Sequence, residues 1–453
     1  MENVQESQAL NEENEKLDLP KFFYWKGRDV SLSGLQVIVT GYLLLFSTDV
    51  LQLSPAFVGG LLMASKIINA FTNLFAGYLV DNTNTKLGRG RPYEFAVIGA
   101  WLCTVLLFSC PPEWSTTVKA IWIVIMYFFI FSIFNALLFA AQTPYMVRAF
   151  PSRTQMIKVS SYGGVVSMLG AMIVSITFPV MMGRLASSGG GWRSLILIYA
   201  VPLCLIGILR LIFVKEDTSI RVEEAGEKLK VKEIRQMFLK NKYVWLYAAI
   251  VGLFNVIQGM NISAQYFTYV VGNISLQGIM GMLSMIMLPV MFVFPKLMKK
   301  MSIANLIQMS AVLSGVGYLI NFFAVANIPA LIVGNVLASL VMLPLSYLGN
   351  VIIMNLATYN ESMGLKRMEG STNVSIGFVG QVSNGVGTGL IGILLGLSGY
   401  VGTNAFQPDG ALLMIRGIYA IIPLLCMVGI LFLAWRFSAL EKKIPELEQK
   451  KQD

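Results

Sequence analysis

Hydrophobic runs of about twenty residues recur along the chain and are separated by short polar stretches. A helix that crosses a bilayer needs about 20 mainly apolar residues, because only a helix satisfies its own backbone hydrogen bonds in hydrocarbon. Twelve runs reach this length. Six lie between Ser33 and Val214, centred near residues 41, 68, 102, 130, 172 and 204, and six lie between Tyr243 and Phe437, centred near 256, 285, 314, 341, 385 and 424. The pattern predicts an all-α membrane protein with twelve transmembrane helices.

A charged stretch at residues 215–242 contains no apolar run and divides the twelve helices into two halves. We therefore expect a cytosolic tail at 1–30, a six-helix bundle at 31–214, a cytosolic connector at 215–242, a second six-helix bundle at 243–437 and a cytosolic tail at 438–453. Two six-helix halves joined in this way are the plan of the major facilitator superfamily, whose halves rock about a central site.

Composition and charge agree with a membrane protein. Hydrophobic residues make up 56% of the 453 residues and charged residues 13%, which excludes an ordinary soluble domain. The net charge of +10 indicates orientation rather than nucleic-acid binding, because cytosolic loops hold the excess of Lys and Arg. With both termini inside, all but five of the 34 basic residues are cytosolic; the exceptions are Lys119, Arg184, Arg193, Arg416 and, within a span, Lys66. We expect a multi-pass protein of the cell membrane.

Residues suited to catalysis or metal binding are scarce. The chain has no His, its four cysteines show no paired spacing, and none of its 24 Asp and Glu residues falls near the middle of a predicted span. No nucleophile and base pair can therefore be assembled from the spans. We expect no catalytic residues, no metal and no cofactor.

One basic residue, Lys66, lies within a predicted span. An ionisable group there is costly, so it is a candidate functional residue, although a lysine can also extend its ammonium to the membrane surface. Asn69 and Asn73 follow Lys66 at helical spacing, which places all three side chains on about one face.

Neutral polar residues also recur at helical spacing within the spans. They are Ser33, Gln36 and Thr40; Asn135 and Gln142; Asn255, Gln258, Asn261 and Gln265; and Asn373, Gln381 and Asn384. Such groups can join helices through hydrogen bonds, or together line a cavity for a ligand rich in hydroxyl or carbonyl groups. Tyr127, Tyr266 and Tyr347 can stack on a sugar ring or simply pack. The predicted substrate site comprises Ser33, Gln36, Thr40, Lys66, Asn69, Asn73, Gln142, Asn255, Gln258, Tyr347, Gln381 and Asn384.

Four motifs give the chain a family resemblance. They are TDVLQLS from Thr48, DNTNTKLGRGRP from Asp81 to Pro92, QYFTYVVGN from Gln265 to Asn273, and LKRMEG from Leu365 to Gly370. Together and in this order they resemble the glycoside-pentoside-hexuronide, or melibiose permease-like, cation symporters of the major facilitator superfamily. The resemblance implies transport of a sugar or sugar conjugate, and it assigns Asp81, Arg89, Arg91 and Pro92 to a cytosolic gating loop.

The resemblance also shows where the chain departs from the family. The two aspartates that bind the coupling cation match Asn69 and Asn73, and the sugar-binding acids match Ser33 and Gln142. Further charged family positions match Gln381, Asn355 and Thr358, whereas the basic residue before the cation site is kept as Lys66. Amides do not titrate, and a sodium site normally needs a carboxylate to offset dehydration of the ion. A coupling cation is therefore doubtful.

Three functions remain open from the sequence. The first is a facilitator that moves a sugar, a glycoside or an acidic sugar conjugate down its own gradient. The second is a carrier of an anionic or amphiphilic non-sugar solute whose head group meets Lys66. The third is a carrier-derived receptor or scaffold that binds a ligand without transporting it. The expected partners are a small-molecule substrate and the lipid bilayer, with no nucleic acid.

Overall fold

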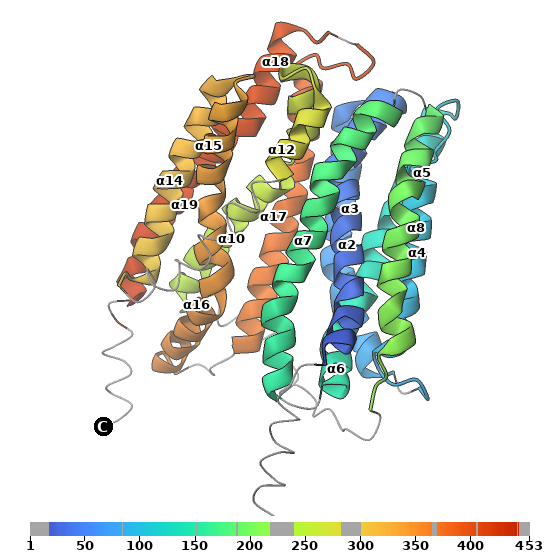
Figure 1. Cartoon of the computed structure of the whole chain (residues 1–453). Helices are drawn as coiled ribbons and strands as arrows, with labels where there is room; N and C mark the ends of the chain where they lie inside the picture. The colour runs from blue at the N-terminus through green and yellow to red at the C-terminus, as the bar shows by residue number, and fades with distance from the viewer. Residues whose placement is uncertain are drawn as a thin grey trace, which may run out of the picture. The chain divides into compact units, whose positions relative to one another are not determined.

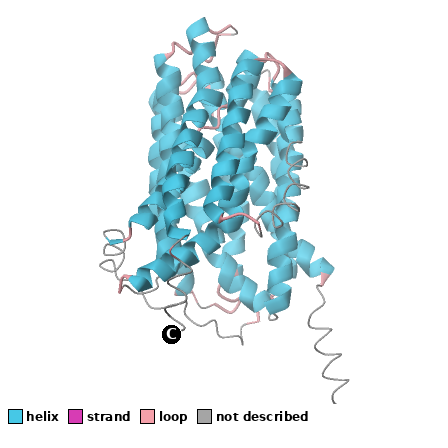
Figure 2. Cartoon of the chain, turned by 90° about the vertical axis from the view of Figure 1, so that its left-hand side faces the viewer, coloured by secondary structure: helices cyan, strands magenta, loops and turns pink. Residues whose placement is uncertain are grey.

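The computed structural model describes residues 18–83, 85–150, 153–186, 189–217, 240–281, 300–364, 369–404, 406–441 and 443 (Figure 1). Within these ranges every regular element is a helix (Figure 2), apart from a single bridge between Thr85 and Gly88. The chain forms two compact units. Unit 1 comprises Met1–Gln52 and Ile68–Ala225, and unit 2 comprises Leu53–Ile67 and Gly226–Asp453. The helix α3 (Pro55–Asp81) therefore contributes its first part to unit 2 and its second part to unit 1.

The other helices of unit 1 follow the apolar runs of the first half. They are α2 (Leu19–Leu45), α4 (Ala96–Leu107), α5 (Thr116–Tyr127), α6 (Ala136–Ala149), α7 (Arg153–Leu185) and α8 (Gly189–Phe213). A π-helical segment, Phe128–Asn135, joins α5 to α6. The helix α2 packs against α7 and α8. It begins at Leu19, well before Ser33, because its Asp18 side chain accepts a hydrogen bond from the Lys21 backbone and caps the helix.

The remaining helices of unit 2 follow the apolar runs of the second half. They are α10 (Lys242–Gly259), α11 (Ser263–Gln265), α12 (Gln277–Gly281), α14 (Ile303–Ala324), α15 (Ile328–Ala338), α16 (Met342–Ser362), α17 (Glu369–Leu397), α18 (Asp409–Arg416) and α19 (Ile422–Glu441). A buried core between α10, α14, α16 and α19 includes Tyr247, Ile307, Ile352 and Met427. The run centred near residue 285 lies outside the described residues. Most of the connector and most of each expected tail also lie outside them.

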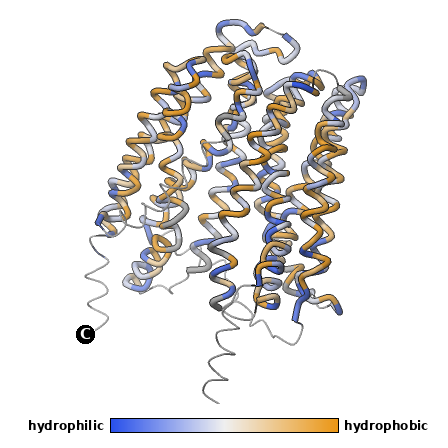
Figure 3. The backbone as a smooth tube through the Cα atoms, in the orientation of Figure 1, coloured by the Kyte–Doolittle hydropathy of each residue, from blue (hydrophilic) through white to orange (hydrophobic). Residues whose placement is uncertain are grey.

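The described helices have the length and polarity of membrane spans. Among the described residues, nine helical stretches are long and apolar enough to cross a membrane, and a tenth is the pair Lys242–Gly259 and Ser263–Val270, bent by 40°. Figure 3 shows hydrophobic positions along the long helices and hydrophilic positions toward their ends. The expectation of an all-α, multi-pass membrane protein is confirmed. The expected span centred near residue 102 corresponds to α4, which is only 12 residues long because the residues before it, Arg91–Phe95, form a 3-10 helix.

Small residues bring the first part of α3 close to α17 within unit 2. A Cβ atom on Gly59 would lie 2.7 Å from the Cα of Gly392, and one on Gly389 would lie 2.6 Å from the Met63 sulfur. A Cβ atom on Gly385 would lie 3.2 Å from the Cβ of Lys66. Small residues allow helix backbones to approach closely in a membrane, where dispersion contacts drive helix association. The packing brings the Lys66 side chain against α17.

Candidate functional site

A cavity of about 270 Å³ lies within unit 1. It is lined by Arg28, Asp29, Leu32, Ser33, Gln36, Asn135, Phe139, Gln142 and Ser167. The α2 residues among these recur every three or four positions, so they share one face of the helix. The cavity therefore brings together Ser33, Gln36 and Gln142 from the predicted substrate site, and adds Arg28 and Asp29, which the sequence analysis did not select.

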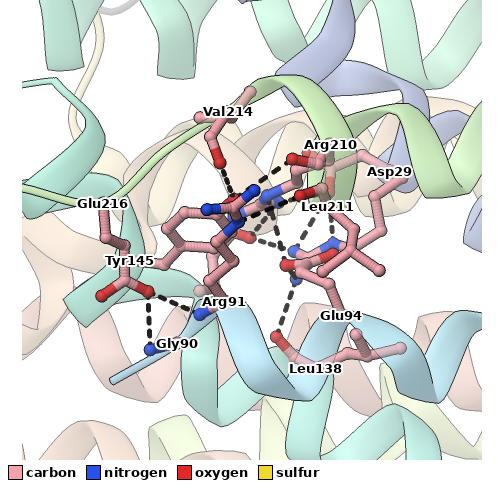
Figure 4. Close-up of polar contacts among 12 residues, drawn as sticks. Asp29, Gly90, Arg91, Glu94, Leu138, Tyr145, Arg210, Leu211, Val214 and Glu216 are labelled. Atoms are coloured by element: carbon pink, nitrogen blue, oxygen red, sulfur yellow. Dashed lines mark hydrogen bonds and ion pairs between the residues drawn. The ribbon is translucent and has the colours of Figure 1, made fainter. Parts of the chain in front are cut away.

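A charged cluster, which we define as Lys26, Arg28, Asp29, Glu94 and Arg210, borders this cavity through Arg28 and Asp29. Figure 4 shows its members Asp29, Glu94 and Arg210. Arg28 Nη1 donates a hydrogen bond to Glu94 Oε1 at 3.0 Å, and Arg210 Nε forms an ion pair with the same oxygen at 3.2 Å. Asp29 pairs with Lys26 at 2.8 Å and with Arg28 at 3.2 Å. The Arg28, Glu94 and Arg210 side chains are at most 3% exposed, so their mutual pairing offsets the cost of burying charge.

Aromatic rings hold the innermost arginine of the cluster. The Arg210 guanidinium carbon lies 3.2 Å from the centre of the Trp25 ring and 4.7 Å from that of Tyr145. The Tyr145 hydroxyl donates to the Val214 carbonyl at 2.8 Å. A guanidinium over an aromatic face gains a cation–π attraction that strengthens away from water. These contacts hold Arg210 beside Gln142, which lines the cavity.

The two arginines determine how Gln142 faces the cavity. Gln142 Oε1 accepts a hydrogen bond from Arg210 Nη1 at 2.9 Å and another from Arg28 Nη2. An arginine only donates, so the oxygen of the amide must face the arginines and its NH₂ group is left to donate to a ligand. In addition, Asn135 Oδ1 is buried with no hydrogen-bond partner among the described residues, and Asp29 is 19% exposed. The cavity thus offers both donors and acceptors.

A second set of predicted residues meets in unit 2 around Lys66. Lys66 Nζ donates to Asn384 Oδ1 at 2.8 Å and to Thr388 Oγ1 at 2.6 Å, both on α17. Thr388 in turn donates to the Gly259 carbonyl at the end of α10, at 3.0 Å. Asn384 Nδ2 donates to the Asn255 carbonyl at 3.4 Å. Within the described part of the chain, Lys66 forms no ion pair with an acidic side chain.

The other predicted residues lie outside these two sets. Thr40 donates to the Gln36 carbonyl at 2.7 Å on the exposed side of α2, and Asn69 and Asn73 follow Lys66 on the part of α3 that belongs to unit 1. Gln258 and Gln381 are exposed on α10 and α17, and Tyr347 lies in α16 with its side chain outside the described atoms. Asn69 Oδ1 is buried and has no hydrogen-bond partner among the described residues.

The predicted gating loop is held by a carboxylate that the sequence analysis did not select. Glu216 accepts hydrogen bonds from the backbone N–H groups of Arg89 and Gly90, both at 2.7 Å, and from that of Arg91 (Figure 4). Arg91 Nε donates to the Leu211 carbonyl at 3.0 Å, at the end of α8. Consecutive backbone N–H groups form a favourable cradle for an anion. Asp81 ends α3, and its side chain lies outside the described atoms.

Two buried acids, Asp29 and Glu94, are not among the residues selected from the sequence. Asp29 lies in the first half of α2 beside the cavity, and Glu94 is fully buried before α4. Asp29 falls in the expected tail at 1–30, and Glu94 lies between the expected gating loop and the next apolar run, so neither was selected. Arg210, within the apolar run of α8, is the signal that would find them, since a buried arginine needs an acid.

Comparison with known proteins gives consistent matches over almost the whole chain. The family described as "MFS/sugar transport protein" matches residues 29–440. The isoprimeverose transporter of Lactiplantibacillus pentosus is 27% identical over 91% of this chain and 88% of its own length. A putative sulfoquinovose importer of Escherichia coli (strain K12) is 26% identical over 96% of this chain and 95% of its own length.

A solved structure from work on proton dependent oligopeptide transporters supports the same fold. It has a TM-score of 0.65 at 12% identity and covers 94% of this chain and 99% of that chain. At this identity the likeness concerns the helical architecture alone. Within the described residues, no group of three or more His, Cys, Asp or Glu side chains is placed to hold a metal ion.

Proposed function

The chain belongs to the MFS/sugar transport protein family, and we propose that it moves a sugar, a glycoside or an acidic sugar conjugate by alternating access without sodium or proton coupling. Membership makes it a multi-pass secondary transporter of the sugar type rather than an enzyme. The printed names of two relatives, an isoprimeverose transporter and a putative sulfoquinovose importer, refer to sugars. Both therefore support a sugar as the substrate class here.

The cavity of unit 1 is the observation that carries the proposal. Its amide and hydroxyl groups, with the Asp29 carboxylate, can both donate to and accept from the hydroxyl groups of a sugar. Phe139, which is 64% exposed, adds an apolar ring beside these groups. Small-molecule sites combine apolar walls with a few placed polar groups in this way. We assign substrate binding to Ser33, Gln36, Asn135 and Gln142.

The proposed absence of cation coupling rests on which carboxylates the chain has and on whether their charge is already paired. Asn69 and Asn73 stand where the resembled family has its cation-binding acids, and an amide offers only a dipole to an ion. Asp29 lines the cavity, but its charge is already paired with Lys26 and Arg28. A sodium ion would have to displace these pairs as well as lose its own water. We therefore propose a facilitator.

Alternating access also requires a cytosolic gate, which we assign to the loop at Arg89 and Arg91. Glu216 ties the backbone of this loop to the residues that follow α8, and Arg91 binds the end of α8 directly. Such contacts bias a transporter toward one access state, because they are made in that state and lost in the other. In this proposal both termini and the connector are cytosolic.

Uptake into proteoliposomes tests the function. We expect radiolabelled sulfoquinovose, or a neutral disaccharide such as isoprimeverose, to enter until the concentrations inside and outside are equal. For the neutral sugar, a sodium gradient, a proton gradient or an uncoupler should leave the final level unchanged. Liposomes without protein provide the control. Accumulation above the outside concentration on an imposed gradient would contradict the uncoupled cycle, and binding without uptake would identify a receptor instead.

A further inference from the structure

We propose that Lys66 is a tethered cation whose ammonium fills a monovalent-cation site formed by Asn384, Thr388 and the carboxyl end of α10. Removing the lysine side chain should leave a site for a small primary ammonium ion from solution. The proposal builds on uncoupled transport, because a site already filled by the protein's own charge has no place for a coupling ion. Its test measures cation binding rather than uptake, so the two proposals can fail separately.

The two side-chain oxygens around Lys66 are oriented toward it. Asn384 Nδ2 donates to the Asn255 carbonyl at 3.4 Å, which leaves Asn384 Oδ1 to face Lys66 at 2.8 Å. Thr388 gives its only hydroxyl proton to backbone carbonyls, so its oxygen is free to accept from Lys66 at 2.6 Å. Both groups thus present an oxygen rather than a hydrogen, as a cation requires.

The end of α10 adds a negative potential to these oxygens. The helix ends at Gly259, and the chain then bends by 40° into Ser263–Val270. The last carbonyls of a helix are left without intrahelical partners and carry the negative end of its dipole. The Gly259 carbonyl is the one that Thr388 contacts. A Cβ atom at Gly259 would lie 2.1 Å from the Asn384 carbonyl oxygen, so the glycine permits this close approach.

The chemistry of the site favours an ammonium over a metal ion. Among the described residues no carboxylate pairs with Lys66, and Asn384 and Thr388 contribute neutral oxygens. A divalent ion normally requires carboxylates to offset its dehydration. The two contacts of 2.6 and 2.8 Å are instead those of N–H donors to oxygen. The site therefore suits a singly charged ion, and the ammonium of Lys66 donates an N–H group to each of the two oxygens.

Chemical rescue of Lys66→Ala tests the proposal directly. The purified full-length variant would be heated in rising concentrations of n-propylammonium chloride, with tetramethylammonium chloride at matched ionic strength as the comparison. We expect a melting temperature below that of the native protein and a saturable rise of several degrees with propylammonium alone, since a ligand of the folded state raises apparent stability. Tetramethylammonium has the same charge but no N–H group to donate.

Lys66→Met is the matched control, because its side chain fills the same channel without a charge. We expect no propylammonium-dependent shift in that variant. No saturable rise in Lys66→Ala, or an equal rise in Lys66→Met, would overturn the proposal. If Lys66→Ala does not fold, a double-mutant cycle that combines Lys66→Met with Thr388→Val tests the proposal instead. The proposal requires Thr388→Val to lower the melting temperature of the native protein and to have little effect beside Lys66→Met; additive losses would overturn it.

Discussion

At the scale of single residues, the cavity depends on which atom each polar side chain presents. In the family that the chain resembles, the position of Gln142 holds an acid, which only accepts hydrogen bonds when ionised. Here Arg28 and Arg210 bind the Gln142 oxygen and leave its NH₂ group for the ligand. The hydrogen-bond polarity at this position is therefore reversed. In the proposed substrate site, we expect a ligand to offer an acceptor, such as a carboxylate, sulfonate or ring oxygen, at this point.

Gln142→Glu separates ligand binding from stability. A glutamate between Arg28 and Arg210 keeps the arginines paired, so we expect a melting temperature at or above that of the native protein. The donor to the ligand is lost, and we expect about tenfold weaker binding, which corresponds to about 1.4 kcal/mol. Isothermal titration with the transported sugar measures this affinity. Gln142→Leu, which leaves the arginines without their acceptor, should lose stability as well. Native affinity in Gln142→Glu would show that the amide does not donate to the ligand.

The sequence predicts the neutral residues of the cavity better than the charged ones. Ser33, Gln36 and Gln142 were selected because polar groups at helical spacing are costly in lipid unless they have a purpose. Arg28 and Glu94 were missed, since their pairing joins residues 66 positions apart and no local pattern records it. The contact of Lys66 with Asn384 likewise spans 318 positions. Both contacts form between helices that are distant in the sequence and adjacent in the fold, so the sequence alone does not indicate them.

At the scale of helices, the apolar runs predict that a helix exists more reliably than they predict where it begins and ends. The helix α2 extends toward the N-terminus beyond its apolar run because its polar residues face the charged cluster rather than lipid. The break between α10 and α11 falls among the polar residues Gln258, Asn261 and Gln265, which the sequence analysis interprets as possible cavity lining rather than as an interruption of the helix. The close contact of α3 with α17 depends on which glycines face each other. That pairing arises only when the helices are placed side by side.

Two neighbouring glycines on α3 test this contact. Gly59 faces Gly392, whereas a Cβ atom on Gly60 would meet nothing within 4 Å. We expect Gly59→Val to force α3 away from α17 and to cost about 1–3 kcal/mol, as overpacking does. Gly60→Val should be tolerated and serves as the matched control. Thermal unfolding in detergent measures the difference. Equal losses in the two variants would mean that helix propensity, rather than packing against α17, sets the effect.

At the scale of the whole molecule, the distribution of Lys and Arg predicts the orientation of the chain. The family and the described helices establish a multi-pass membrane protein, and the side on which each loop lies remains a prediction from the positive-inside rule. The basic connector at 215–242 and the basic loop around Arg89 belong to the same predicted side. Asn404, in the loop before α18, belongs to the opposite side.

Impermeant thiol labelling in intact cells tests this orientation. In a background whose four native cysteines are replaced by alanine, a cysteine at Asn404 should be labelled and one at Glu227 should not. Permeabilising the cells should make Glu227→Cys react as well, which controls for its accessibility. Labelling of both positions in intact cells, or of Glu227→Cys alone, would contradict cytosolic termini and a cytosolic connector.

The covalent attachment of the Lys66 ammonium has an electrical consequence. A sodium symporter releases its ion at the end of each cycle, so the membrane voltage contributes about 2.3 kcal/mol per charge for each 100 mV to the final gradient of the sugar. An ammonium bound to the backbone of α3 returns to its starting position with the protein, and no charge crosses the membrane with a neutral sugar. In the proposed uncoupled cycle, voltage can then change how fast the transporter reorients, but it leaves the final ratio of inside to outside neutral sugar at one.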